Sequence, residues 1–192
     1  MTDTKAHLKR YLKNARAAVL WKLEGLGEYD LRRPLTPTGT NLLGLVKHLA
    51  CVDADYLGRV FGRPFPEQHP WFAEDAEDNA DMWATPEEST EFITDLYRRV
   101  WEHGDATIDA LDIDDTGVVP WWGDAEVTLG EILVHLVAET NRHAGHADIV
   151  RESIDGAAGL SAKNSNLPGD DADWWAAYRG KVEQAAREAA GE

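Results

Sequence analysis

Residues 128–156 read TLGEILVHLVAETNRHAGHADIVRESIDG, a long amphipathic helical pattern. The pattern opens on a capping box, with Thr128 as the cap and Glu131 three residues later. Its apolar and ionisable residues recur on one stripe at three- and four-residue intervals: Ile132, His135, Glu139, His143, His146 and Val150. Asp155-Gly156 then stops it. We therefore predict a helix from Thr128 to about Ile154, with four ionisable side chains on the face that should be buried.

The rest of the chain shows similar helical periodicity, and alternating strand patterns are nearly absent. Helices are expected over about 3–26 and 41–61, and over about 85–111, where Thr85-Pro-Glu-Glu88 repeats the capping-box pattern. Turn-rich residues 28–40 and two long connections, about 62–84 and 112–127, join them. The fold class is therefore all-α, a four-helix bundle with long connections and an additional C-terminal helix. We expect a single domain over 1–192, with its core at about 5–156 and a helical appendage at about 171–190.

Composition excludes several classes of function. The formal charge is −16, a field that repels phosphate backbones and anionic lipid headgroups, so nucleic-acid binding is not expected. No apolar run approaches the roughly 20 residues that span a bilayer, and the N-terminus lacks the apolar segment of a signal peptide. Cys51 is the only cysteine, which fits a reducing compartment. We expect a cytoplasmic protein without a membrane partner, in which Cys51 is a small buried residue rather than a metal ligand.

The stripe on 128–154 carries the chemistry. Residues four apart on a helix lie one turn apart, so Glu139 and His143 can aim at one point. His48, on the helix expected over 41–61, shares a face with apolar residues and could supply a third ligand. Three protein ligands leave one coordination position open, as in catalytic zinc sites. The alternative is structural: Glu139 could pair with a protonated histidine or with Arg142, because a buried carboxylate needs a partner.

Four motifs resemble the DinB-like superfamily of metal-binding four-helix bundles, in its actinobacterial branch: Leu45-Val-Lys-His48-Leu, Phe61-Gly-Arg-Pro-Phe-Pro66, Pro120-Trp-Trp-Gly123 and Glu139-x-x-Arg-His143-x-Gly-His146-Ala-Asp148. The resemblance spans most of residues 5–156. That superfamily includes S-transferases that use mycothiol or bacillithiol, and mycothiol-dependent maleylpyruvate isomerase. Many members have three histidine ligands, whereas this chain has Glu139 in place of one, as in the isomerase branch.

Carried over residue by residue, the resemblance implies that His48, Glu139 and His143 bind a divalent metal. Zinc is the first choice, and nickel, manganese and iron are alternatives because a carboxylate also suits harder ions. His146 then lies beside the site, where many relatives have glutamine, and His135 is a rival ligand one turn before Glu139. The other candidates are His146 and Arg142 as catalytic residues, Arg59, Tyr56 and Trp122 as cofactor-binding residues, and a cavity mouth formed by Trp83, Trp121 and Trp122.

The resulting hypothesis is a metal-dependent thiol S-transferase. A low-molecular-weight thiol, mycothiol, would be the co-substrate, and its thiolate would attack an electrophilic small molecule. His146 or His135 would accept the thiol proton. Three alternatives remain open: an isomerase that uses the same thiol as a cofactor, a metal-dependent hydrolase, and a non-catalytic, stress-associated metal-binding bundle. Relatives are often dimers, so a homodimer is also compatible with the resemblance.

Overall fold

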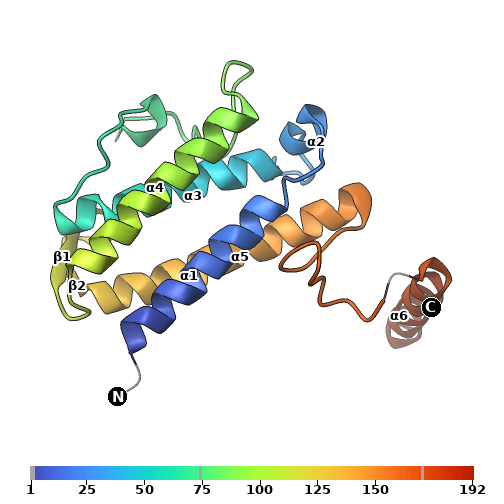
Figure 1. Cartoon of the computed structure of the whole chain (residues 1–192). Helices are drawn as coiled ribbons and strands as arrows, with labels where there is room; N and C mark the ends of the chain where they lie inside the picture. The colour runs from blue at the N-terminus through green and yellow to red at the C-terminus, as the bar shows by residue number, and fades with distance from the viewer. Residues whose placement is uncertain (1–2, 74, 170) are drawn as a thin grey trace.

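The computed structural model describes residues 3–73, 75–169 and 171–192, and helices dominate it. Four long helices form the bundle: α1 (Thr4–Trp21), α3 (Leu42–Leu57), α4 (Thr90–Ala110) and α5 (Leu129–Asp155). Figure 1 shows α1 running beside α5 and α4 beside α3, and these are the two most extensive packing pairs. A short helix, α2 (Glu28–Arg32), and a C-terminal helix, α6 (Ala172–Ala190), complete the helical part. The predicted all-α class is confirmed.

The sequence signals at the ends of α5 act as expected. The Thr128 hydroxyl accepts a hydrogen bond from the Glu131 backbone N–H, and the Glu131 carboxylate accepts one from the Thr128 N–H. At the other end Gly156 is left-handed, with φ 81°, a conformation that glycine adopts without strain. Between these caps the helix buries a run of aliphatic residues against α1 and α3: Leu129, Ile132, Leu133, Leu136, Ala147 and Val150. Capping and packing therefore agree on this helix.

The predicted start of the third long helix at Thr85 is wrong. α4 begins at Thr90, and Ser89 is its cap, accepting a hydrogen bond from the Phe92 N–H. Thr85 and Glu88 do form the expected contact, with the Glu88 carboxylate accepting the Thr85 N–H at 2.8 Å. The Glu88 N–H returns to the Thr85 carbonyl, so these residues close a single isolated turn. The same carboxylate also pairs with Lys47 on α3, and this tertiary contact outweighs the local helix signal.

Other boundaries also differ from those predicted. The expected 3–26 helix ends at Trp21, and the 41–61 helix ends at Leu57, followed by the 3-10 turn η1 (Arg59–Phe61). The turn-rich residues 28–40 include the helix α2. The 112–127 connection contains an antiparallel hairpin of β1 (Thr116–Val119) and β2 (Ala125–Thr128), joined through the 3-10 turn η3 (Pro120–Trp122). Each strand has only four residues, too few for a clear alternating pattern.

α6 differs from the bundle helices because none of its residues is buried. In Figure 1 it lies beyond the end of α5, after the connection that follows Gly156. That the whole chain forms one domain stays a prediction. Among the described residues, no helix combines the length and apolar character needed to cross a membrane.

Candidate metal centre

The candidate ligands lie on two facing helices of the bundle. Asn41 caps α3 by accepting a hydrogen bond from the Gly44 N–H, and the helix then presents His48 from its middle. α5 packs against α3 and presents Glu139 and His143 one turn apart. His143 is 8% exposed, and the His48 and Glu139 side chains are partly buried. The bundle therefore brings the three predicted ligands to one place at the edge of its core.

The donor atoms are close enough to share an ion. One donor atom from each of His48, Glu139 and His143 lies within 4.8 Å of the other two. Glu139 Oε1 lies 2.9 Å from His143 Nε2 and 3.8 Å from His48 Nε2. In a tetrahedral zinc site with bonds of about 2.0–2.1 Å, neighbouring donors are about 3.3 Å apart. The two separations from Glu139 bracket that value, and the separation between the two histidine donors is at most 4.8 Å. The donor set therefore fits a divalent metal in number and chemistry, and its spacing is close to the one required.

Asp81 orients one of these ligands, and the sequence reasoning missed it. Its Oδ2 lies 2.7 Å from His48 Nδ1, so Nδ1 donates to the carboxylate and leaves the Nε2 lone pair free to face Glu139. Metal-bound histidines commonly donate their second ring N–H to a carboxylate in this way. Burial raises the pKa of Asp81, but the hydrogen bond and charge of His48 outweigh burial, and the pKa is lowered. The only feature of the sequence that pointed to this contact was the acidic character of the connection before α4.

The charges of the site compensate one another. Burial opposes the ionised form of Glu139, but the hydrogen bond from His143 and the nearby imidazoles outweigh it and lower the pKa of Glu139. Burial also lowers the pKa of His143, and the facing ring of His48, 4.8 Å away between centroids, lowers it further. Neutral histidine and ionised carboxylate are the forms that bind metals. The site therefore favours these forms near neutral pH.

A cavity of about 380 Å³ opens beside the donors. Tyr56, Trp121 and His135 form an aromatic side of it, and the Trp121 indole N–H donates to the Tyr56 hydroxyl at 3.0 Å. Burial raises the pKa of Tyr56 more than this hydrogen bond lowers it, so the phenol keeps its proton. His48, Glu139 and Asp81 also line the cavity. A larger cavity of about 610 Å³ lies beside α6, but no metal-donor cluster of the described residues lies there.

The remaining candidates occupy different positions around this site. His146 is exposed, with its Nδ1 3.4 Å from His143 Nδ1 on the side away from Glu139. Arg142 is exposed on α5 and does not line the cavity. Arg59 lies over the ring of Trp121, 5.8 Å from its centroid. These three assignments stay predictions.

The aromatic candidates and Cys51 differ in whether they line the cavity. Trp121 lines the cavity, while Trp122 packs edge-on against His135 and lies beside Tyr56. Trp83 is 49% exposed and does not line the cavity. Cys51 lines the cavity but is buried, and burial raises the pKa of its thiol well above the usual value. Without a bound metal it stays a thiol, and its assignment as a residue that is not a ligand stays a prediction.

The family model described as mycothiol S-transferase matches residues 7–156, well over half of the chain. The chain belongs to the mycothiol S-transferase family. It is therefore a transferase, and the family resemblance in the motifs is confirmed. No curated protein sequence matches the chain significantly. The family region contains the three candidate ligands, Asp81 and the cavity, and it ends where α5 ends, before α6.

Proposed function

We propose that this family member is a metal-dependent transferase that activates a low-molecular-weight thiol, mycothiol, for attack on an electrophilic small molecule. The observation that carries the proposal is the convergence of His48, Glu139 and His143 beside a cavity large enough for small substrates. A buried histidine pair alone could be structural. Here the Glu139 carboxylate, one turn from His143 on α5, joins the pair, and Asp81 fixes the orientation of the His48 imidazole.

His48, Glu139 and His143 would hold the metal, zinc in the first instance, with nickel, manganese or iron as alternatives. When bound, the metal would supply the positive charge that favours a thiolate over a thiol at neutral pH. The two imidazoles come from different helices, and the packing of α3 against α5 fixes their separation. The donor set would therefore be largely arranged before substrate enters.

The other residues of the cavity position the substrates and move the proton. Tyr56 and Trp121 offer an aromatic wall in which the two rings meet edge to face, with a hydrogen bond between them. His135 lines the cavity, whereas the exposed His146 does not. We therefore assign His135 as the acceptor of the thiol proton, with His146 acting on His143 from outside. With an alkyl chloride substrate, the sulfur–carbon bond forms as the carbon–chlorine bond breaks, and chloride leaves with the electron pair.

The test uses the zinc-loaded protein with mycothiol and the alkyl chloride monochlorobimane, whose thioether product is fluorescent. Conjugation should be fast with the native protein and should fall to the uncatalysed rate with His48→Ala. His7→Ala is the matched control, because His7 is exposed on α1 far along the chain from the donors. It should react at the native rate. Equal rates for native protein and His48→Ala would sink the proposal.

The same preparation separates the alternative functions. Ester or amide cleavage without added thiol would favour a hydrolase, and rearrangement of an unsaturated substrate with full recovery of thiol would favour an isomerase. A non-catalytic bundle would bind metal and lose its fold on metal removal, because a structural site couples binding to folding. The transferase should keep its fold without metal. We include a cytoplasmic location in the proposal, since a free thiol substrate needs a reducing compartment.

A further inference from the structure

The residue before His48 is a buried lysine whose surroundings are unusual. Lys47 is 2% exposed, and its ammonium group donates to residues of the connection before α4. It donates to the carbonyls of Ala80 and Trp83 at 2.8 and 2.9 Å and to the Glu88 carboxylate at 2.9 Å. It also lies over a tryptophan ring, 3.9 Å from the centroid of Trp71. A buried ammonium group needs such complete pairing, so the connection is folded around it.

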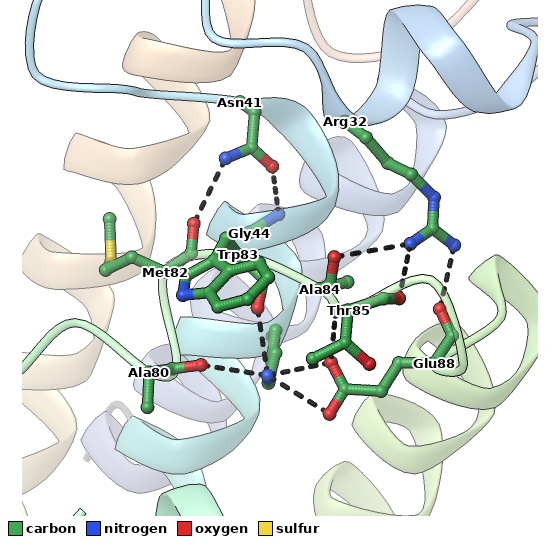
Figure 2. Close-up of polar contacts among 10 residues, drawn as sticks. Arg32, Asn41, Gly44, Ala80, Met82, Trp83, Ala84, Thr85 and Glu88 are labelled. Atoms are coloured by element: carbon green, nitrogen blue, oxygen red, sulfur yellow. Dashed lines mark hydrogen bonds and ion pairs between the residues drawn. The ribbon is translucent and has the colours of Figure 1, made fainter. Parts of the chain in front are cut away.

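Gly44 of α3 and its cap residue Asn41 hold the same connection. Asn41, Gly44 and Lys47 are three residues apart and therefore lie on one stripe of the helix. The Asn41 side chain donates to the Met82 carbonyl at 3.1 Å. A Cβ at Gly44 would lie 1.8 Å from that carbonyl oxygen, so only glycine allows this approach. Figure 2 shows the Asn41, Gly44 and Met82 contacts above and the Ala80, Trp83 and Glu88 contacts below.

The far side of the connection is fixed as well. Arg32 on α2 donates to the carbonyls of Thr85 and Glu88 at 2.9 and 2.7 Å (Figure 2). The Glu88 carboxylate, while paired with Lys47, also accepts the Thr85 N–H. Glu88 is therefore held through both its backbone and its side chain.

Asp81 lies between two of these anchored groups. The carbonyl before it, of Ala80, is held by Lys47, and its own neighbour Met82 is held by Asn41. Its carboxylate reaches His48 Nδ1 at 2.7 Å from a turn that belongs to no helix or strand. The precision of that contact therefore depends on the anchors from α3. We propose that Lys47 is a positioning residue for the metal centre, which holds Asp81 against His48 through the connection.

This inference builds on the proposed function, because His48 is there a metal ligand. A positioning role for Lys47 differs from a purely structural role in one respect. A structural lysine would affect only the stability of the fold, whereas a positioning lysine must also affect the affinity of the site for metal, and only while Asp81 is present.

Lys47→Met removes the ammonium group and keeps the aliphatic stem. Zinc affinity is measured by competition with a chromogenic chelator, for native protein, Lys47→Met, Asp81→Ala and the double variant. Asp81→Ala should weaken binding by about 10–100-fold, the usual effect of losing the carboxylate partner of a ligating histidine. Lys47→Met should weaken it by about tenfold. The double variant should bind no more weakly than Asp81→Ala, because the effect of Lys47 passes through Asp81.

Lys22 supplies a matched control. It is also fully buried, and its ammonium group pairs with Asp148 and with the Gly159 carbonyl, over the ring of Trp21. It anchors the segment after α5 and not the connection that carries Asp81. Lys22→Met should therefore lower stability while zinc affinity stays within about twofold of native. Native affinity in Lys47→Met, or losses that multiply in the double variant, would overturn the inference.

A metal-free readout keeps the inference separate from the proposed function. In the native apo-protein, long-range ¹H–¹⁵N spectra should show His48 protonated at Nδ1, as the contact with Asp81 requires. Lys47→Met should lose this single tautomer, and Lys22→Met should keep it. Should Lys47→Met not fold, Gly44→Ala displaces the same connection through Met82 and should have the same effect. If native protein binds no zinc, the metal centre fails, while the tautomer result still decides the role of Lys47.

Discussion

The ion pair inside the bundle gives a prediction whose size follows from the structure. Arg16 on α1 donates to Asp53 on α3 at 2.9 Å, and both side chains are almost fully buried, at 2% and 1% exposure. Arg16 also reaches Asp105 on α4 at 3.0 Å, so one guanidinium group joins three helices. Among the described residues, Asp53→Ala leaves that group buried with the partly exposed Asp105 as its one remaining ion-pair partner.

Breaking a buried pair by removing one partner costs about 3–5 kcal/mol, because an uncompensated charge stays inside. The remaining contact to Asp105 places this case near the lower limit, so we expect a loss of about 3 kcal/mol. For a chain of this size each kcal/mol shifts Tm by roughly 2–4 °C, which gives a fall of roughly 6–12 °C. Asp53 is not one of the candidate ligands, so zinc affinity below the unfolding temperature should not change.

Urea unfolding followed by circular dichroism measures the loss, with the double variant Arg16→Met/Asp53→Leu as the control. Replacing both partners by apolar residues removes the unpaired charge, so the double variant should regain most of the stability that Asp53→Ala loses. The reasoning is refuted if Asp53→Ala costs less than about 1 kcal/mol, or if the double variant is as unstable as the single one.

Three further predictions concern pH, capping and the cavity wall. The pKa of His143 is lowered from 6.5 and that of Glu139 is lowered too, so the metal-free protein should lose stability as pH falls below 6.5. Urea unfolding at two pH values checks this. His143→Gln should reduce the change in the free energy of unfolding with pH. Thr128→Ala removes the cap of α5 and should cost about 0.5–2 kcal/mol in the same assay. Trp121→Ala should raise KM roughly fivefold, equivalent to about 1 kcal/mol, with kcat nearly unchanged.

The sequence predicted the elements whose signals are local. α5 follows from its capping box, its apolar stripe and the terminal glycine, and the cap and the glycine occur where expected. Of the four ionisable residues that the stripe placed on the buried face, only His143 is buried; His135 and Glu139 are partly exposed and His146 is exposed. The hairpin at 116–128 was missed because its strands are four residues long. The start of α4 was misplaced because Glu88, which completes the capping pattern in the sequence, forms an ion pair with Lys47 of another helix. No local pattern contains that information.

The candidate site divides in the same way. Helical spacing alone brings Glu139 and His143 together. The third ligand, His48, requires only that its helix pack against theirs. Asp81 lies 33 residues after His48 in a connection without helical periodicity, so its contact depends on how the chain folds back. The role of Lys47 was equally hidden, because a lysine in a helix pattern normally indicates a solvent-exposed face. Its burial becomes visible only with the connection in place.

The most direct test of the account is a crystal structure of the zinc-loaded protein with anomalous data on both sides of the zinc absorption edge. The account predicts one strong peak, bound by His48 Nε2, the Glu139 carboxylate and His143 Nε2, with Asp81 still hydrogen-bonded to His48 Nδ1. Two results would contradict it: a zinc peak bound by other residues, or no zinc peak at all in crystals grown with zinc, with the three side chains still paired with one another.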